Sequence, residues 1–408
     1  MVKRNEDIRM KRYHKMTPEG MRDLLFEECA AVKDVGRRAS ELFKNRGYHE
    51  VITPTTEYYD VFETGDAEIV QETAYKLIDT QGRILVLRPD STSPIARFTA
   101  TRLRDAEPPI RLCYTQNVFR MSKGMSGHSN ETVQSGIELI GVNGLLSDIE
   151  VLCIAAETFK AVGLSDFRME LGHAGLFRCI ADGIPVEESV KEELREAVES
   201  KNGGALQSLI SKLPDMPETR ALSALPRLFG GAEVLRHPAL LACEAACEPL
   251  SYLEKVYGAL GELSLDAGIQ IDLGLVHRNE YYTGLVFRGY IAGSGEAVIS
   301  GGRYDHLLER FGSPHPAIGF ALDLNAIAGA LPGSVRQEVK FCDVLVAALK
   351  GHETEAVRRW RELLESGLRC ELLECGDIET AKESARRRGI PRVEMIGEAS
   401  ETGKERKI

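Results

Sequence analysis

The sequence predicts an α+β fold with an antiparallel sheet core, a helical insertion and a small C-terminal α/β domain. Three observations support this prediction. Segments with alternating apolar residues come in pairs joined by polar turns, which is typical of antiparallel strands. Between about residues 180 and 267 the alternation gives way to apolar residues at helical spacing. After a boundary signal at Leu331-Pro332-Gly333-Ser334, strand and helix patterns alternate.

The core domain is predicted to span residues 17–333 and to begin with an amphipathic helix within residues 16–47, where apolar residues recur at helical spacing. Gly47 is a suitable helix stop, and residues 48–54 follow as a strand that ends at a proline. The basic segment of residues 1–16 is expected to be a solvated terminus rather than an RNA-binding arm.

Four further segments before residue 143 have strand patterns. Residues 75–78 and 84–87 are predicted to form a hairpin around Thr80-Gln81-Gly82. Residues 110–119 and 134–142 are predicted to be longer strands joined by a polar, glycine-rich loop. Such pairing, with helices before and between the strands, favours α+β over a doubly wound parallel sheet.

A helix is predicted at residues 147–162 and a strand at residues 167–171, before the helical insertion at about residues 180–267. Strand patterns return at residues 270–305 and 317–324, so the insertion is expected to interrupt the sheet.

Residues 338–397 are predicted to form a small βαβαβ domain. Its strands are expected at residues 343–347, 370–373 and 392–396, and its helices at 353–365 and 378–388. Residues 398–408 are a charged tail for which disorder is expected.

Composition sets outer limits on function. The net charge of −11 disfavours a large nucleic-acid footprint, and no apolar run is long enough to span a bilayer. The polar start of the chain is unlike a secretory signal, and nine scattered cysteines suit a reducing compartment, so a cytoplasmic location is expected. Cys243 and Cys247 lack a second ligand pair beside them, so no metal is predicted. No cofactor is predicted either, and the sequence has no P-loop and no Rossmann glycine fingerprint after a strand.

Several polar side chains fall where strands end or share a face. Asp90 and Thr92 lie two residues apart after a strand, and extended geometry would point both to one side. Gln134 and Glu138 lie four apart on a predicted strand, and Arg120 closes another.

Tyr282 and Tyr304 each follow a polar turn. An ammonium group needs carboxylates and a carboxylate needs a guanidinium, while an imidazole fits between tyrosines and a carboxylate. The whole set would therefore suit a free amino acid with a ring side chain. Each residue singly is more often a surface or core residue, and Gly301-Gly302-Arg303-Tyr304-Asp305 is equally compatible with a tight turn, so spacing alone leaves function open.

Segment for segment, residues 17–327 resemble the catalytic core of histidyl-tRNA synthetases and their paralogues, which have a class II synthetase fold. The matching motifs are Phe43–Pro54 (the dimer-forming first motif), Arg111–Gly141 (the second), Glu280–Gly284 and Gly301–Asp305 (the histidine-specific motifs) and Ala317–Ile327 (the third). The resemblance implies a histidine pocket lined by Asp90, Thr92, Arg120, Gln134, Glu138, Tyr282 and Tyr304. Asp90 stands where the family usually has glutamate.

The positions that would contact ATP or help activation depart from the family pattern. They hold Ser122, His128, His277 and Ala326, and of the expected ATP contacts only Arg120 is kept. Phosphoryl chemistry depends on cations placed at developing charge, and losing one such contact typically costs about 10²–10³ in rate. No useful adenylate formation is therefore expected. The C-terminal domain resembles a truncated anticodon-binding domain that stops near Gly397, so tRNA recognition is not expected either.

This combination most resembles the regulatory subunits of ATP phosphoribosyltransferase, which have no catalysis of their own. The resemblance implies a short-form catalytic subunit as partner, in a hetero-octamer with a homodimeric core, for the first step of L-histidine biosynthesis. It also makes L-histidine the candidate effector. Two alternatives stay open: a catalytic histidyl-tRNA synthetase, and a paralogue with another task, such as a histidine sensor or an RNA-linked scaffold.

Overall fold

The computed structural model describes residues 15–62, 73–121, 129–276, 281–332 and 342–397. The chain divides into two compact units, residues 1–336 and residues 337–408, which are described separately below.

The first unit is built on a nine-stranded sheet with the order β1-β5-β6-β12-β11-β10-β7-β9-β8. Its strands are β1 (His49–Glu50), β5 (Ile110–Phe119), β6 (Glu131–Ile140), β7 (Phe167–His173), β8 (Phe229–Gly230), β9 (Ile269–Asp272), β10 (Leu285–Ile291), β11 (Ile299–Arg303) and β12 (Ala317–Asp323). All pairings from β5 through to β7 are antiparallel, so the predicted α+β class with an antiparallel core is confirmed. The sheet also contains two parallel pairs, β1 with β5 and β7 with β9, which join segments far apart in the sequence.

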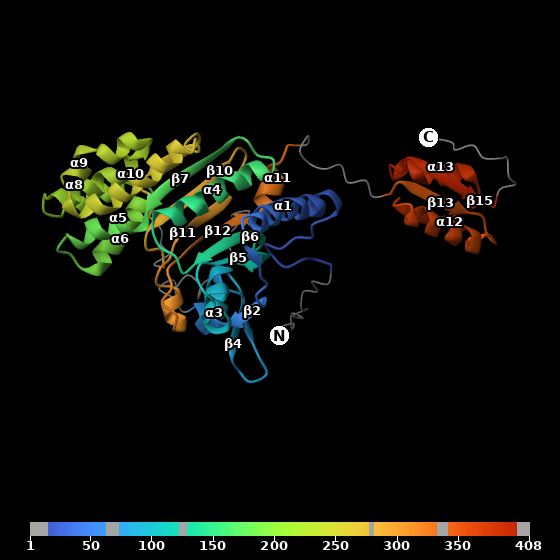
Figure 1. Cartoon of the computed structure of the whole chain (residues 1–408), viewed down its shortest axis with the longest axis horizontal. Helices are drawn as coiled ribbons and strands as arrows, with labels where there is room; N and C mark the ends of the chain where they lie inside the picture. Colours follow the sequence, from blue (N-terminus) through green and yellow to red (C-terminus); the bar gives the residue numbers. More distant parts are fainter. Residues whose placement is uncertain (1–14, 63–72, 122–128, 277–280, 333–341, 398–408) are drawn as a thin grey trace, which may run out of the picture. The chain divides into compact units, whose positions relative to one another are not determined.

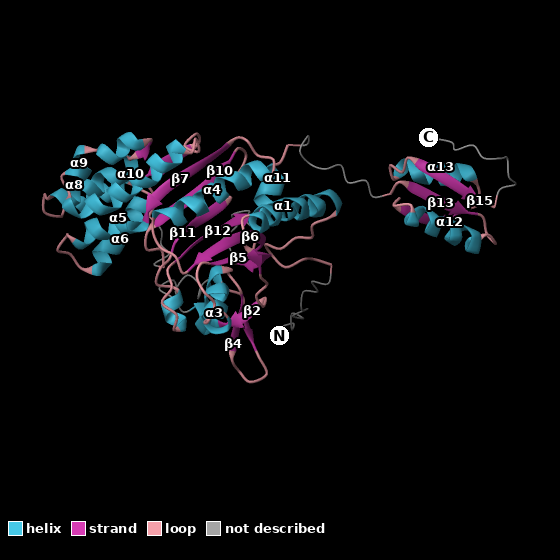
Figure 2. Ribbon diagram, in the orientation of Figure 1, coloured by secondary structure: helices cyan, strands magenta, loops and turns pink. Residues whose placement is uncertain are grey.

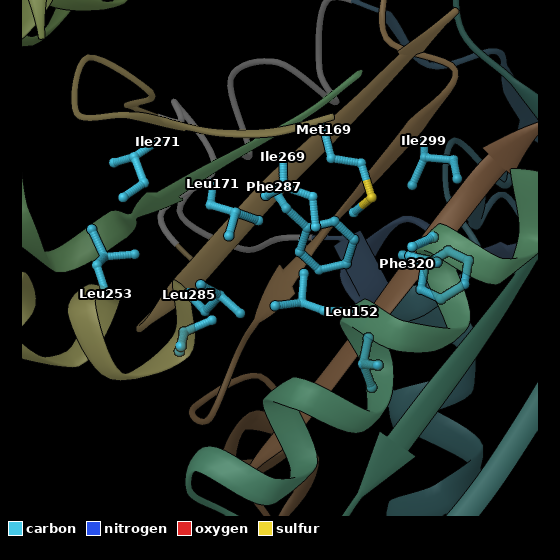
Figure 3. Close-up of a cluster of buried hydrophobic side chains, with 14 of the residues drawn as sticks. Leu152, Met169, Leu171, Leu253, Ile269, Ile271, Leu285, Phe287, Ile299 and Phe320 are labelled. Carbon is cyan, nitrogen blue, oxygen red and sulfur yellow. The ribbon is translucent and has the colours of Figure 1, made fainter. Parts of the chain in front are cut away.

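One face of this sheet is covered by helices (Figure 1). They are α1 (Phe26–Asn45), α4 (Leu145–Ala161), α11 (Leu324–Ala330) and α10 (Cys247–Glu262). The main core lies on this face and includes Phe287 and Phe320 of the strands and Leu152 of α4 (Figure 3). Burying such side chains stabilises the fold by about 1.5–3 kcal/mol each.

Helices α5 to α10 lie between β7 and β9 and gather at one end of the sheet (Figure 2). The first five are α5 (Ala174–Asp182), α6 (Glu188–Glu199), α7 (Gly203–Ile210), α8 (Pro217–Ala224) and α9 (Pro238–Leu241). We call residues 174–262 the helical insertion. It begins directly after β7, where the His173 Nδ1 accepts a hydrogen bond of 3.2 Å from the Gly175 amide and so caps α5.

The other face of the sheet carries α3 (Thr92–Arg102) and a three-stranded sheet with the order β2-β4-β3. The bounds of these strands are β2 (Thr56–Tyr58), β3 (Lys76–Ile78) and β4 (Ile84–Leu87). The antiparallel β3–β4 pair is the predicted hairpin.

The predicted first helix lies within residues 16–47, as expected, at Phe26–Asn45. The strand predicted over residues 48–54 is shorter than expected and is reduced to His49 and Glu50. The strand is short because the Thr53 amide donates to the side chain of Gln116, at its Oε1 and 3.2 Å, instead of to a neighbouring backbone carbonyl.

The second unit is a three-stranded parallel sheet with the order β14-β13-β15 and a helix on each face. Its elements are β13 (Val344–Ala348), α12 (Glu353–Glu365), β14 (Cys370–Glu374), α13 (Ile378–Arg387) and β15 (Arg392–Ile396). Val344 and Val346 pack against α12, whereas Leu345 packs on the opposite side with Ala385 of α13. Within the described parts of both units, no helix combines the length and the apolar character needed to cross a bilayer.

Candidate functional site

A cavity of about 620 Å³ opens on the sheet face that α1 and α4 leave free. All the side chains predicted to form a ligand pocket line it: Asp90, Thr92, Arg120, Gln134, Glu138, Tyr282 and Tyr304. Strand alternation sets the direction of these side chains. On β6, Ile137 and Leu139 enter the main core, so Gln134 and Glu138 face the cavity, as their four-residue spacing predicts.

Glu138 is almost fully buried at the floor of the cavity, with 1% of the residue exposed. The Thr92 hydroxyl donates to its Oε1 at 2.8 Å, and the Tyr304 hydroxyl donates to its Oε2. Burial raises the pKa of Glu138 to about 8, despite these two hydrogen bonds, and nearby Asp90 acts in the same direction. Glu138 is therefore mostly neutral at pH 7, so the floor of the cavity carries an exchangeable proton.

Two glycines make room for this floor. Gly319 pairs with Glu138 across the sheet, and a side chain at Gly319 would overlap the Glu138 carboxylate. Gly302 is next in the same row, and a Cβ there would lie 2.8 Å from the Tyr282 ring. The carboxyl and the ring thus lie over bare backbone, which is a role that only glycine can fill.

Gly301 and Gly302 belong to β11, so the tight turn considered for this motif is not present. Tyr304 is buried directly after the strand, and burial raises the pKa of its phenol well above 10.0, so the hydroxyl remains a donor.

Asp90 and Arg120 lie together at the rim. The expected extended geometry of Asp90 and Thr92 is wrong, because Thr92 is the first residue of α3. Asp90 accepts from the Ser93 amide at 2.8 Å, so the start of a helix, not a strand, brings both side chains to the cavity. Burial raises the pKa of Asp90 above 3.8, while Ser93 and Arg120 oppose the shift. Arg120 is anchored by its Nε, which donates to the Pro89 carbonyl at 2.7 Å.

Tyr282 and Tyr114 complete the deep part of the cavity. Burial raises the pKa of Tyr282 to about 12, so its phenol is neutral, and its ring lies 4.6 Å from that of Tyr281. Tyr114 was not predicted, although it is buried in the lining opposite Gly136. The signals that sequence reasoning missed were the glycines inside strands at Gly136 and Gly319, which indicate close approach by another group.

Of the positions that depart from the synthetase pattern, Ser122, His128 and His277 lie outside the described residues. Ala326 lies in the first turn of α11, where its amide donates to the Asp323 Oδ1 at 2.9 Å. The preceding Asn325 accepts from the Val133 amide at 2.8 Å. These two positions therefore serve the helix and the sheet and bring no charge to the cavity.

The cysteine pair of the insertion is not arranged as a metal site. Cys243 is buried and Cys247 is exposed, and the Cys247 thiol contacts the Cys243 carbonyl at 3.8 Å. Among the described residues, no group of three or more His, Cys, Asp or Glu side chains is arranged to hold a metal ion.

A family profile and individual proteins of known sequence both match most of this chain. The sequence profile of the histidyl-tRNA synthetase family matches residues 20–327. A protein of Clostridium kluyveri named ATP phosphoribosyltransferase regulatory subunit is 39% identical over 381 residues, which cover 92% of this chain and 97% of that protein. One of Clostridium acetobutylicum with the same name is 38% identical, and the match covers 92% of this chain and 93% of that protein.

Among solved structures, this chain is similar to a Bacillus halodurans protein described as an ATP phosphoribosyltransferase regulatory subunit/histidyl-tRNA synthetase. The TM-score is 0.81 at 30% identity, over 94% of this chain and 99% of that one.

Proposed function

The chain belongs to the histidyl-tRNA synthetase family and, within it, to the regulatory subunits of ATP phosphoribosyltransferase, and we propose that its cavity binds free L-histidine as an effector. The partner that we propose is a short-form catalytic subunit, which carries out the first step of L-histidine biosynthesis. One observation carries the proposal: a buried Glu138 carboxyl, held by Thr92 and Tyr304, lies in a cavity that Asp90 and Arg120 also line.

Each part of a histidine molecule has a matching group in this cavity. The ammonium group is assigned to Asp90 and the carboxylate to Arg120 and Gln134, because charge-assisted hydrogen bonds are the strongest polar contacts. The imidazole is assigned to the floor, against Tyr282 and between Glu138 and Tyr304. An imidazole both donates and accepts, and the Glu138–Tyr304 pair offers both functions.

We propose that the chain has no catalytic activity of its own. The cationic side chains that line the described part of the cavity are Arg120 and Arg288, and Ala326 replaces the arginine expected in the third motif. Phosphoryl transfer needs several cations preorganised around developing charge. Histidine-dependent ATP–pyrophosphate exchange by the purified chain would contradict this and would favour a catalytic synthetase.

We also propose a homodimeric core within a hetero-octamer. The first-motif segment, α1 and β1, supports it, because β1 is the edge strand of the sheet as described and Ile52 beside it is 84% exposed. The C-terminal unit is proposed to be related to an anticodon-binding domain and not to recognise tRNA. A cytoplasmic location is proposed as well, because a reducing compartment suits cysteines that form no disulfide within the described residues.

Titration of L-histidine into the purified chain by calorimetry tests the binding. We expect saturable binding that Asp90→Ala weakens by at least about 30-fold, because the ammonium group loses its charged partner. The matched control is Asp105→Ala, since the Asp105 side chain is 95% exposed and lies outside the cavity lining. Equal affinity in all three proteins would reject this pocket as the site.

Reconstitution with a short-form catalytic subunit tests the regulatory role. We expect transferase activity to depend on this chain and histidine to lower it. Asp90→Ala should keep the activation and lose the response to histidine. If adding the chain gives no gain in transferase activity, the regulatory proposal fails.

A further inference from the structure

A fully hydrogen-bonded arginine lies directly behind Tyr304. Arg303 is 4% exposed, and because neighbouring strand residues point to opposite faces, its side chain lies on the α4 side of the sheet. The acceptors of its hydrogen bonds are Asp148 (twice, once at 2.9 Å), Ser147 at 2.7 Å, Asp305 at 3.0 Å and the Val142 carbonyl at 3.3 Å. These bonds use all five N–H groups of the guanidinium, so the backbone of β11 is fixed where Tyr304 follows it.

The carboxylate that holds Arg303 is shared with the helical insertion. Asp148 of α4 has no exposed surface, and its second oxygen accepts from the Tyr252 hydroxyl of α10 at 2.5 Å. Burial and the Asp148 charge raise the pKa of Tyr252, so the phenol stays protonated and keeps donating. Removing one partner of such a buried group leaves an uncompensated polar atom, which is costly.

The two tyrosines of the cavity are also tied to each other through the backbone. The Thr283 amide donates to the Arg303 carbonyl at 2.8 Å, and the Asp305 amide donates to the Thr283 hydroxyl at 3.1 Å. Next to Thr283, the Gly284 carbonyl accepts from the Ala174 amide, the first residue of the insertion, at 2.8 Å. The insertion is therefore hydrogen-bonded, at its start and through its last helix, to segments that support the cavity lining.

We propose that Arg303, Asp148 and Tyr252 are positioning residues that couple the helical insertion to the ring-binding end of the cavity. The inference rests on the proposed binding of histidine. A shift of α10 would disturb Asp148, then Arg303 and then the Tyr304 hydroxyl over Glu138, so insertion and ligand must be linked. Because linkage is reciprocal, a partner protein that moves the insertion changes histidine affinity, and histidine changes that partner's affinity by the same factor.

A double-mutant cycle on histidine affinity tests the coupling. The cycle combines Tyr252→Phe and Tyr304→Phe, each of which removes one hydroxyl, and Tyr257→Phe on the same helix is the matched control. We expect Tyr252→Phe to weaken binding about five- to tenfold and the control to bind as wild type. The double variant should bind no more weakly than Tyr304→Phe alone, because Tyr252 acts through Tyr304. Independent effects that multiply, or an unchanged Tyr252→Phe, would overturn the inference.

Hydrogen exchange on the wild-type protein is a second test, and it does not depend on whether a variant folds. Saturating L-histidine should slow amide exchange in α10, whereas an unchanged α10 would overturn the coupling. The two ideas fail in different ways. A wild-type chain that shows no histidine binding overturns the proposed function, and with it the coupling. A chain that binds histidine but shows additive variants overturns only the coupling.

Discussion

The Glu138 proton should make the core less stable as the pH rises, and Glu138→Gln should remove this effect. The pKa of Glu138 is raised from 4.5 to about 8 by burial. Between these values the folded protein holds a proton that the unfolded chain releases. The contribution of this proton to the free energy of unfolding is therefore fully present below pH 4.5 and is lost as the pH rises towards 8. The slope is about 1.4 kcal/mol per pH unit, which amounts to up to about 5 kcal/mol over the window.

Glutamine has nearly the same shape and cannot ionise. Its amide keeps one oxygen that can accept from Thr92 or Tyr304 and loses the second acceptor, at a cost of about 1 kcal/mol at every pH. The variant should therefore be less stable than wild type below about pH 5 and more stable above about pH 6. The sign of the difference reverses because a constant loss is set against a loss that grows with pH.

Urea unfolding between pH 5 and 8 measures this difference, with far-ultraviolet circular dichroism as the signal. Fluorescence of Trp360, the single tryptophan, would report the C-terminal unit instead of the core. Burial lowers the pKa of His173 to about 4, which makes stability fall below about pH 6.5 and so opposes the trend in either protein alone. The His173 effect is present in both proteins, so it cancels when the stability of the variant is subtracted from that of the wild type. Stability curves that run parallel for the two proteins would refute a neutral, buried Glu138.

Three further predictions follow from the same geometry. Gly319→Ala should abolish histidine binding in calorimetry, because its methyl group would overlap the Glu138 carboxylate, while Gly329→Ala, which meets nothing within 4 Å, should bind normally. Histidine affinity, measured by calorimetry across pH, should peak between about pH 6.5 and pH 8. The free imidazole ring loses its own proton near the lower value, and Glu138 loses its proton near the upper one. An affinity that is flat from about pH 5 to 9 would contradict a proton shared between the ring and Glu138. Leu345→Ala should destabilise the C-terminal unit by about 2–5 kcal/mol, seen as earlier unfolding by Trp360 fluorescence, and should leave histidine binding unchanged; a loss of binding would show that the two units do not behave separately.

Local patterns in the sequence were sufficient for most elements of the fold. The hairpin of β3 and β4, the strands β5 and β6 and the βαβαβ unit follow from the period of apolar residues and from turn residues, both of which act over a few positions. The prediction failed where distant segments decide. β1 and β9 pair in parallel with strands far along the chain, and the strand expected over residues 48–54 is cut short by a contact between Thr53 and Gln116.

The sequence by itself determined which chemical groups this protein has: a carboxylate and an arginine for the two charges of an amino acid, and tyrosines with a glutamate for a ring. Only the tertiary structure decided their state and surroundings. The pKa of Glu138 is raised because the fold buries its carboxyl over the bare backbone of Gly319, and the hydrogen bonds from Thr92 and Tyr304 only partly oppose this shift. Arg303, adjacent to Tyr304 in sequence, instead bonds to Asp148 of α4 on the other side of the sheet, and Asp148 also accepts from Tyr252 of α10. Desolvation and hydrogen-bond partners depend on residues far apart in the chain, so no local pattern encodes them.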